Sequence, residues 1–250
     1  MLRKTTLPVL RQLCAFVAVL LTWVAGGLAT AHAAELAESA LIGYSVDGRY
    51  FAFEEFGVQD GSGFAYSNVF VIDLERDRWV PGTPVRRRAV DETERLFDVR
   101  AEAMAEAQTH LDRLHISAAY RTLAATTPME VGDQERHLTF NPRPILTPID
   151  PLLTMRLENF PMASPRDCFD MVETAGFALT LQADGGPGRT LHRDERLPYS
   201  RACPAHYGIS AIITPFDGAP GRAVAMISVY QLGFEGLDRR FLAVPFDLPF

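Results

Sequence analysis

The residues best suited to chemistry are scattered histidines and carboxylates, and none of them falls in a catalytic spacing. The histidines after residue 33 are His110, His115, His137, His192 and His206. The sequence has no Gly-x-Ser-x-Gly elbow, His-Glu-x-x-His motif, P-loop or Gly-x-Gly-x-x-Gly fingerprint. We therefore predict no catalytic residue, no metal ligand set and no cofactor. A site assembled from distant positions stays open as the alternative.

Two pairs of side chains come closest to a reactive arrangement. Glu54 and Glu55 are adjacent carboxylates, but successive strand residues point to opposite faces, so they cannot act together as acid and base. Glu106 and His110 are four residues apart on a predicted helix and could share a metal ion. The same spacing puts His110 at the edge of the apolar stripe, so a packed histidine is the simpler interpretation.

The loop 56–67 is our candidate contact surface, because loops on rigid scaffolds often carry binding residues. Its residues of interest are Phe56, Asp60, Phe64 and Tyr66. The alternative is that these aromatic rings pack back onto the core.

Three extended segments must position this loop. Asp47-Gly48 is a tight-turn dipeptide, and the aromatic-rich run Arg49–Phe56 after it predicts a strand. Asn68–Leu74 predicts a second strand, and Trp79 opens a third short extended piece.

One long helix is predicted over Asp91–Leu114, with Asp91 as N-cap. Its apolar residues follow 3-and-4 spacing and form one stripe. They are Leu96, Val99, Ala103, Ala107, Leu111 and Leu114. The segment Ser117–Thr126 extends or follows this helix, and Ala34–Ile42 is interpreted as a connection.

The remaining chain predicts strands separated by turns. The strands are Leu153–Phe160, Phe177–Gln182, Ile209–Thr214 and Arg222–Gln231. Two turns, at Asp184 and Asp217, share the pattern Asp-Gly-x-Pro-Gly-Arg. Convergent turn chemistry explains this pattern, and an internal duplication is the alternative.

The first 33 residues predict a signal peptide. Arg3, Lys4 and Arg11 precede an apolar run, and Ala31-His32-Ala33 supplies an A-x-A cleavage site, so we place the cut between Ala33 and Ala34. A retained membrane anchor is the alternative. After cleavage we expect no transmembrane span.

Charge and cysteine content describe the predicted mature chain. The leader holds three of the 24 cations and none of the 31 acids, which leaves 21 cations and a net charge of −10. Such an acidic chain is poorly suited to nucleic acid, because phosphate neutralisation needs excess cations. Cys168 and Cys203 remain, and in an oxidising compartment an isolated pair predicts one disulfide. Two buried thiols are the alternative.

Short motifs over nearly all of the chain after the leader carry a family resemblance. They are Asp47-Gly48-Arg49-Tyr50-Phe51-Ala52-Phe53-Glu54-Glu55, Asp60-Gly61-Ser62-Gly63, Tyr66-Ser67-Asn68, Arg201-Ala202-Cys203-Pro204, Gly233-Phe234-Glu235-Gly236 and Asp238-Arg239-Arg240-Phe241. Together they resemble a bacterial family of predicted secreted proteins, domain of unknown function 2259, which implies secretion and no established activity. The stretch 45–50 with 69–73 is also similar to one hairpin of a TolB-type β-propeller blade. The chain has no second copy, so we interpret this as shared hairpin chemistry.

We predict a mainly β (α+β) fold, with antiparallel sheets or a β-sandwich, one long packed helix and a disulfide staple. Residues 34–250 form one secreted domain, and a subdivision near residue 128 is the alternative. The predicted function is a noncatalytic binding or scaffolding module of the cell envelope, with an envelope protein or a glycan as partner. The alternative is an envelope hydrolase with a dispersed site that uses His192 or His206 with a carboxylate. The predicted location is the periplasm or the cell exterior.

Overall fold

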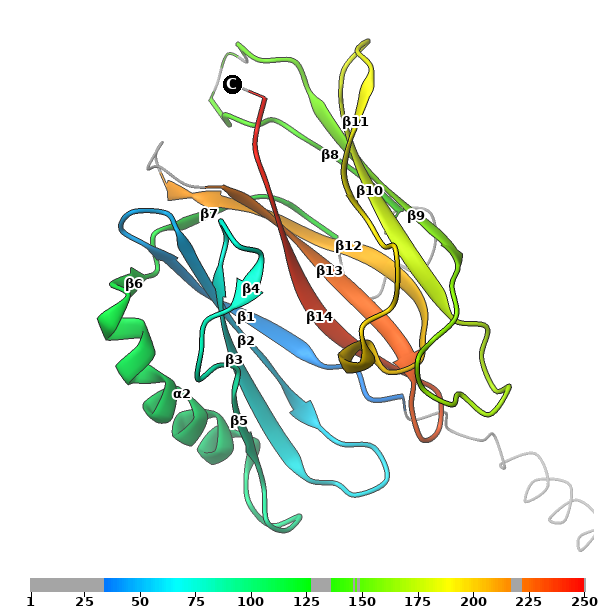
Figure 1. Ribbon diagram of the computed structural model, residues 1–250. Coiled ribbons are helices and arrows are strands. Elements are labelled where there is room, and N and C mark those ends of the chain that lie inside the picture. The colour runs from blue at the N-terminus through cyan, green and yellow to red at the C-terminus, as the bar shows by residue number, and fades with distance from the viewer. Residues whose placement is uncertain (1–33, 127–135, 146, 148, 217–221, 250) are drawn as a thin grey trace, which may run out of the picture. The chain divides into compact units, whose positions relative to one another are not determined.

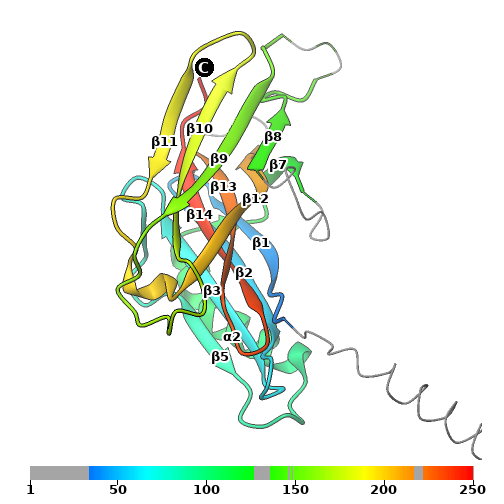
Figure 2. The same cartoon turned by 90° about the vertical axis from the view of Figure 1, so that its right-hand side faces the viewer.

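The computed structural model describes residues 34–126, 136–145, 147, 149–216 and 222–249. Residues Ala34–Phe250 form one compact unit of three antiparallel sheets and one long helix. The layers follow in the order helix, first sheet, middle sheet, third sheet (Figure 1, Figure 2). The predicted mainly β fold with one packed helix is confirmed.

The first sheet holds the aromatic-rich segments that the sequence singled out. Its strands run in the order β4-β3-β2-β1-β6, and β5 also pairs with β3. They are β1 (Glu38–Ser45), β2 (Tyr50–Val58), β3 (Ala65–Asp73), β4 (Arg78–Trp79), β5 (Val85–Arg88) and β6 (Ile116–Ser117). The predicted β2–β3 hairpin is confirmed, with Tyr50 opposite Asp73 and Val58 opposite Ala65.

The other two sheets are built from the second half of the chain. The middle sheet has the order β14-β13-β12-β7 and the third sheet the order β11-β10-β9-β8. The middle strands are β7 (Tyr120–Ala125), β12 (Pro204–Pro215), β13 (Ala223–Leu232) and β14 (Leu237–Phe246). The third sheet consists of β8 (His137–Phe140), β9 (Leu153–Pro161), β10 (Ala175–Ala183) and β11 (Gly188–Arg193), and a 3₁₀ turn, η2 (Tyr199–Arg201), precedes β12. Of the two similar turns, the first joins β10 to β11, and the second lies outside the described residues.

The middle sheet is buried on both faces. Along β13, Ala225 and Ile227 pack against the third sheet, while Val224 and Met226 pack against the first sheet. Because successive side chains of a strand point to opposite faces, this one strand contributes to two separate hydrophobic cores. This double burial makes the middle sheet the structural centre of the described chain.

The helix α2 (Leu96–Arg113) covers the outer face of the first sheet. The predicted stripe is buried at Val99, Ala103, Ala107 and Leu111. The predicted start at Asp91 was wrong, because its carboxylate accepts hydrogen bonds from the backbone and hydroxyl of Thr93 at 2.8 and 2.6 Å. That local turn occupies Asp91, and the helix begins five residues later.

One segment differs from its prediction, one open alternative is decided, and one strand was not predicted. Ser117–Thr126 does not continue the helix, since His115 takes a left-handed backbone (φ 50°) that ends it, and β6 and β7 follow. The supposed connection 34–42 contains most of β1, which has a bulge between Leu41 and Gly43. The C-terminal segment forms β14 despite Pro245, because an edge strand tolerates a missing N–H.

The predicted disulfide between Cys168 and Cys203 is confirmed, with an S–S distance of 2.09 Å. It joins the connection between β9 and β10 to the residue before β12. The bond closes a loop with a sequence separation of 35. Restricting the unfolded chain in this way stabilises the fold by about 3–4 kcal/mol in the chain-entropy description.

Candidate ligand-binding cleft

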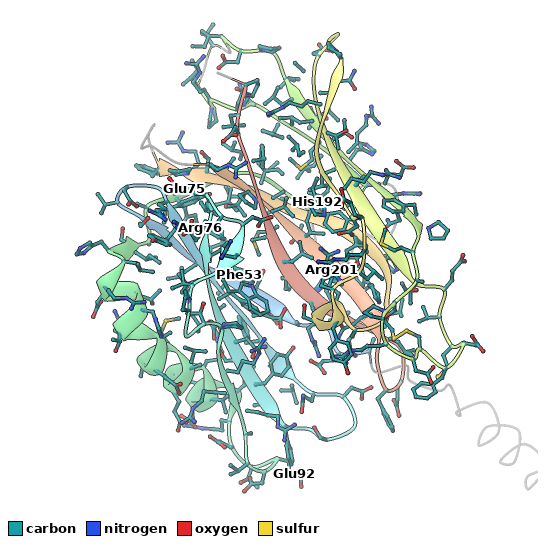
Figure 3. All side chains as sticks on the ribbon, in the orientation of Figure 1. Phe53, Glu75, Arg76, Glu92, His192 and Arg201 are labelled. Carbon is teal, nitrogen blue, oxygen red and sulfur yellow. A yellow bond between two sulfur atoms is a disulfide. The ribbon has the colours of Figure 1, made fainter. Side chains whose placement is uncertain are left out.

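A cleft of about 590 Å³ opens where edge strands of the three sheets meet. These strands are β4 of the first sheet, β14 of the middle sheet and β11 of the third sheet. Figure 3 shows Phe53 between the first and middle sheets, with His192 and Arg201 on the side of β11 and η2. The cleft therefore combines residues from positions 53 to 244 of the chain.

About half of the residues that line the cleft are apolar. Phe53 and Phe70 of the first sheet stack in parallel, with ring centroids 4.8 Å apart. Val229 and Leu242 of the middle sheet line the opposite wall. A concave site that combines apolar walls with polar groups is typical of small-ligand sites.

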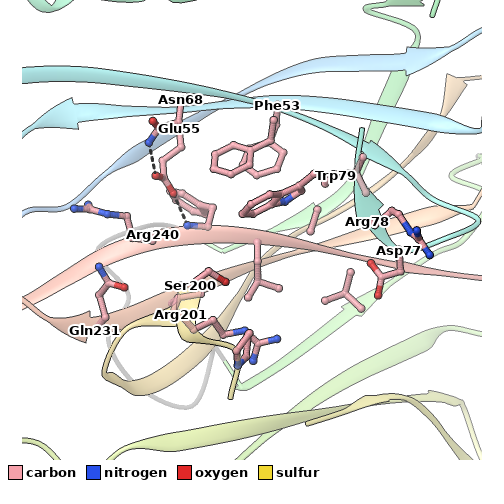
Figure 4. A pocket seen from close by; sticks show the side chains of 18 of the residues that line it. Phe53, Glu55, Asn68, Asp77, Arg78, Trp79, Ser200, Arg201, Gln231 and Arg240 are labelled. Carbon is pink, nitrogen blue, oxygen red and sulfur yellow. Dashed lines mark hydrogen bonds between the residues drawn. The ribbon is translucent and has the colours of Figure 1, made fainter. Parts of the chain in front are cut away.

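Trp79 is the most exposed aromatic wall residue, with 44% of its surface accessible. Its ring is tilted against Phe70 at 5.8 Å, and the Arg86 guanidinium lies over its face at 5.6 Å. Arg78 lines the same end of the cleft (Figure 4). An exposed indole with one guanidinium over its face and a second at the same end of the cleft is suited to a ligand that combines a flat apolar face with an anionic group.

Glu55 and Arg240 mark the other end of the cleft (Figure 4). The Glu55 carboxylate accepts hydrogen bonds from the Phe241 amide at 2.7 Å and from Asn68 Nδ2 at 3.2 Å. Burial raises the pKa of Glu55, while the Phe241 amide and Arg240 act in the opposite direction. The Arg240 guanidinium is itself held by Glu35, 2.5 Å away.

Glu54 points the opposite way, toward α2. Arg100 donates to both of its oxygens at 2.9 and 2.8 Å, and Ser67 Oγ donates at 2.8 Å. The two adjacent glutamates therefore lie on opposite faces of β2, as strand alternation predicted. They cannot form an acid–base pair.

The third-sheet side of the cleft contains a charged network around Asp194. His192 Nε2 lies 3.0 Å from Asp194 Oδ1, and Arg201 Nη1 donates to Oδ2 at 2.6 Å. The Phe177 amide donates to the same carboxylate at 2.9 Å. Although burial opposes the shift, hydrogen bonds from His192 and Arg201 hold the pKa of Asp194 below its usual range. Arg201 also lies over the Phe177 and Tyr207 rings.

The four residues of the predicted contact loop do not form one open surface. Phe56 is buried beneath the Arg100 guanidinium, 3.5 Å from its ring centroid. Tyr66 is buried and its hydroxyl accepts a hydrogen bond from Arg240 at 3.0 Å. Phe64 packs beside Arg88, and Asp60 lies at the loop tip. The aromatic members thus pack onto the body, which is the alternative that the sequence left open.

The remaining suspected chemical groups have structural partners. Glu106 pairs with Arg87 at 3.8 Å, and His110 Nδ1 lies 3.2 Å from an Arg113 nitrogen. The pair is therefore not arranged around a shared ion. Within the described part of the chain, no group of three or more His, Cys, Asp or Glu side chains is placed to hold a metal.

The family of predicted secreted proteins (DUF2259) matches residues 52–246, which is most of the chain. The chain belongs to this family. No curated protein matches it. Among the residues that the structure describes, no helix is long and apolar enough to cross a membrane.

In this DUF2259 chain, the sequence identified some cleft residues but not the cleft. Trp79 was predicted only as the start of a short extended piece, and His192 only as a member of a dispersed hydrolase site. Only the packing of the first sheet against the middle sheet brings β4 and β14 to the border of one space. The available signal was Trp79 beside Arg78, a large aromatic exposed in a two-residue strand.

Proposed function

We propose that this DUF2259 protein is a noncatalytic binding module of the bacterial periplasm, and that the edge cleft binds an acidic saccharide of the envelope. The observation that carries the proposal is the exposed Trp79 ring with Arg78 and Arg86 beside it in a cleft of about 590 Å³. An aromatic face suits the apolar face of a sugar ring, and guanidinium groups bind carboxylates in a two-pronged geometry. The predicted mature chain is strongly acidic, yet Arg78 and Arg86 line one end of the cleft, where Asp77 is also placed, and neither arginine forms an ion pair with another described residue. We expect these two cations to favour an anionic ligand.

Tryptophan fluorescence tests the proposal directly, because Trp79 is the only tryptophan after residue 33. Uronic-acid oligosaccharides are titrated into the protein, with neutral oligosaccharides of equal length as the comparison. We expect the acidic series to change the emission and the Arg86→Gln variant to bind at least about tenfold more weakly, the usual effect of losing one charge-assisted hydrogen bond.

Arg193→Gln is the matched control. Arg193 is an exposed arginine that lies over the Phe160 ring at 4.2 Å, as Arg86 lies over Trp79, but it has Glu158 3.9 Å away and does not line the cleft. Calorimetry repeats the titration without relying on Trp79. Equal binding of acidic and neutral sugars, or equal losses in the two variants, would contradict the proposal.

A hydrolase is the second candidate, and it is supported by the His192–Asp194 contact with Ser200 on the same wall. A serine, a histidine and an acid are the parts of a nucleophilic site. Against it, Asp194 is already held by Arg201 and the Phe177 amide, and His192 stacks on the Phe177 ring at 4.6 Å. Ester hydrolysis that is abolished by Ser200→Ala would favour this candidate over the binding module.

A further inference from the structure

The segment that follows the predicted cleavage site is fixed along the start of β14. The Arg239 amide donates to the Glu35 carbonyl at 2.8 Å, and the Ala37 amide donates to the Arg239 carbonyl at 3.3 Å. The Arg239 guanidinium donates to the Ala37 carbonyl from two nitrogens, at 3.0 and 2.8 Å. The backbone that follows Ala34 is therefore held in place by β14.

Carboxylates outnumber cations around this segment. Arg240 contacts Glu35 at 2.5 Å and Asp238 at 3.5 Å. Asp60 and Glu55 add further negative charge that acts on the same cluster. Burial raises the pKa of Asp238, and repulsion from Glu35 and Asp60 adds to that increase. Two guanidinium groups, those of Arg239 and Arg240, thus lie near four carboxylates, and that of Arg239 is bound to the Ala37 carbonyl.

Asp60 gives an independent sign that a donor is missing. Its Oδ2 atom is buried and has no hydrogen-bond partner in the described part of the chain. Its loop reaches the β13–β14 loop, since a Cβ atom at Gly61 would lie 3.1 Å from the Phe234 ring. A buried carboxylate oxygen without a donor is costly, so a cation at this corner would stabilise it.

The nitrogen of Ala34 lies beside these carboxylates. The Glu35 amide donates to Asp238 Oδ1 at 3.3 Å. One residue spans at most about 3.6 Å, so the Ala34 nitrogen is within about 7 Å of the Asp238 carboxylate. Ala34 also packs on the β13–β14 loop, because a Cβ atom at Gly236 would lie 3.4 Å from the Ala34 Cβ.

We propose that this corner is a binding site for the protein's own processed N-terminus. Cleavage after Ala33 turns an uncharged amide nitrogen into an α-ammonium group, which binds Asp238 and Asp60 and supplies the missing cation. Processing thereby completes the ionic cluster next to the cleft, whatever the cleft binds. The charged or titratable groups that face this site are Glu35, Glu55, Asp60, Tyr66, Glu235, Asp238, Arg239 and Arg240.

The sequence offers a direct probe of that group. No lysine follows residue 33, so the α-amino group of Ala34 is the only primary amine in the processed chain. Reductive methylation with ¹³C-formaldehyde on protein exported with its own leader gives one NMR signal, and that signal is titrated with pH. We expect the pKa of the group to lie at least about one unit above its value in the same protein unfolded in urea, near the usual 7.7–8.0.

Variants test whether the carboxylates, and not the fold in general, raise the pKa of the Ala34 α-amino group. Asp238→Asn is expected to remove at least half of the increase, and Asp60→Asn, on the loop between β2 and β3, gives a second test if the first variant folds poorly. Asp247→Asn removes a carboxylate that pairs with Arg222 instead and is expected to leave the titration unchanged. An unshifted α-amino group, equal effects of Asp238→Asn and Asp247→Asn, or a first residue other than Ala34 by intact mass overturns the proposal.

Thermal unfolding provides a readout that needs no label. A raised amine pKa stabilises the fold below about pH 8, and the stabilisation is lost as pH rises through the folded-state value. We expect acetylation of Ala34 to lower the unfolding midpoint by about 2–4 °C at pH 7 and to have no effect above about pH 10. The same loss in the Asp238→Asn background would contradict the ion pair.

Discussion

The two faces of the first sheet each hold one buried glutamate, and the two differ in what surrounds them. Glu54 is 2% exposed and Glu55 is 3% exposed, on neighbouring positions of β2. Glu54 faces a helix and receives the Arg100 guanidinium on both oxygens. Glu55 faces a sheet edge and receives one backbone amide and one side-chain amide.

The difference shows how the neighbouring layer determines what a buried carboxylate can do. A helix presents long side chains, so α2 places a guanidinium over Glu54 and makes a structural ion pair. The edge strand β14 presents its backbone, and burial then raises the pKa of Glu55 beside the cleft. The helix-covered face thus holds a structural ion pair, whereas the edge face holds a buried carboxylate that is paired only with amide donors.

Breaking the ion pair on the helix side is expected to have the largest effect. Arg100→Met leaves the charge of Glu54 buried without its partner, while methionine still packs on Phe56. We expect the free energy of unfolding to fall by about 2–4 kcal/mol, toward the lower end because the Arg100 side chain is 36% exposed. Urea unfolding measures the loss, with an unchanged m-value.

Two companion variants decide whether the ion pair is the cause. Arg87→Met removes an exposed arginine that pairs with Glu102 at 2.9 Å, and a change below about 0.5 kcal/mol is expected. Adding Glu54→Gln to Arg100→Met should recover much of the lost stability, because no buried charge remains. If Arg100→Met costs no more than Arg87→Met, the contrast between the two faces is wrong.

Replacing the glutamate on the cleft side is expected to have a smaller effect of opposite sign. Glu55→Gln keeps an acceptor for the Phe241 amide and removes the cost of a buried charge, so we expect a gain of about 1 kcal/mol at pH 7. A raised carboxyl pKa means that stability is lost as pH rises from about 4.3, the usual glutamate value, through the folded value. The gain should therefore disappear below about pH 4.

Urea unfolding at pH 4 and pH 7 checks this prediction, with Glu54→Gln as the comparison. Glu54→Gln weakens the contact to Arg100 and is expected to lower stability at pH 7. A loss of stability in both variants would mean that Glu55 is ionised and well paired, and the two faces would then be alike.

The sequence predicted those parts of this comparison that depend on local spacing. The Asp47-Gly48 turn and the aromatic alternation located β2 and β3, and the opposite orientation of Glu54 and Glu55 followed from strand geometry. The apolar stripe of α2 was likewise correct, because 3-and-4 spacing is a property of one segment. The cysteine pair was predicted because only two cysteines follow residue 33.

The partners of Glu55 could not be predicted, because they depend on pairing over long distances. The Phe241 amide is 186 residues away and belongs to β14, a strand that Pro245 conceals in the sequence. The cleft is bordered by β4, β11 and β14, and edge position is a property of sheet order. Local sequence patterns do not reveal the order of strands in a sheet or the packing of sheets, so they could not predict the cleft.

The smallest expected effect concerns Tyr66, which lies on the cleft-side face and near the cluster of Arg240. Burial raises the pKa of Tyr66 above the usual tyrosine range, while Arg240 opposes this increase and Glu35 supports it. Tyr66 should therefore stay protonated while the protein remains folded. The Tyr66→Phe variant is expected to show the same amplitude of reversible tyrosine ionisation around pH 10 as the unmodified protein, followed by ultraviolet absorbance.

The result has meaning only while the fold is intact, so circular dichroism is recorded at each pH. Tyr199→Phe is the matched control, since Tyr199 is exposed and its removal should lower the reversible amplitude. If Tyr66→Phe lowers the amplitude as much, water reaches the Tyr66 hydroxyl and the face between the first and middle sheets is open beyond the cleft. Glu55 would then lie close to solvent, and the contrast with Glu54 would reflect only the presence of Arg100 and not the burial of both groups.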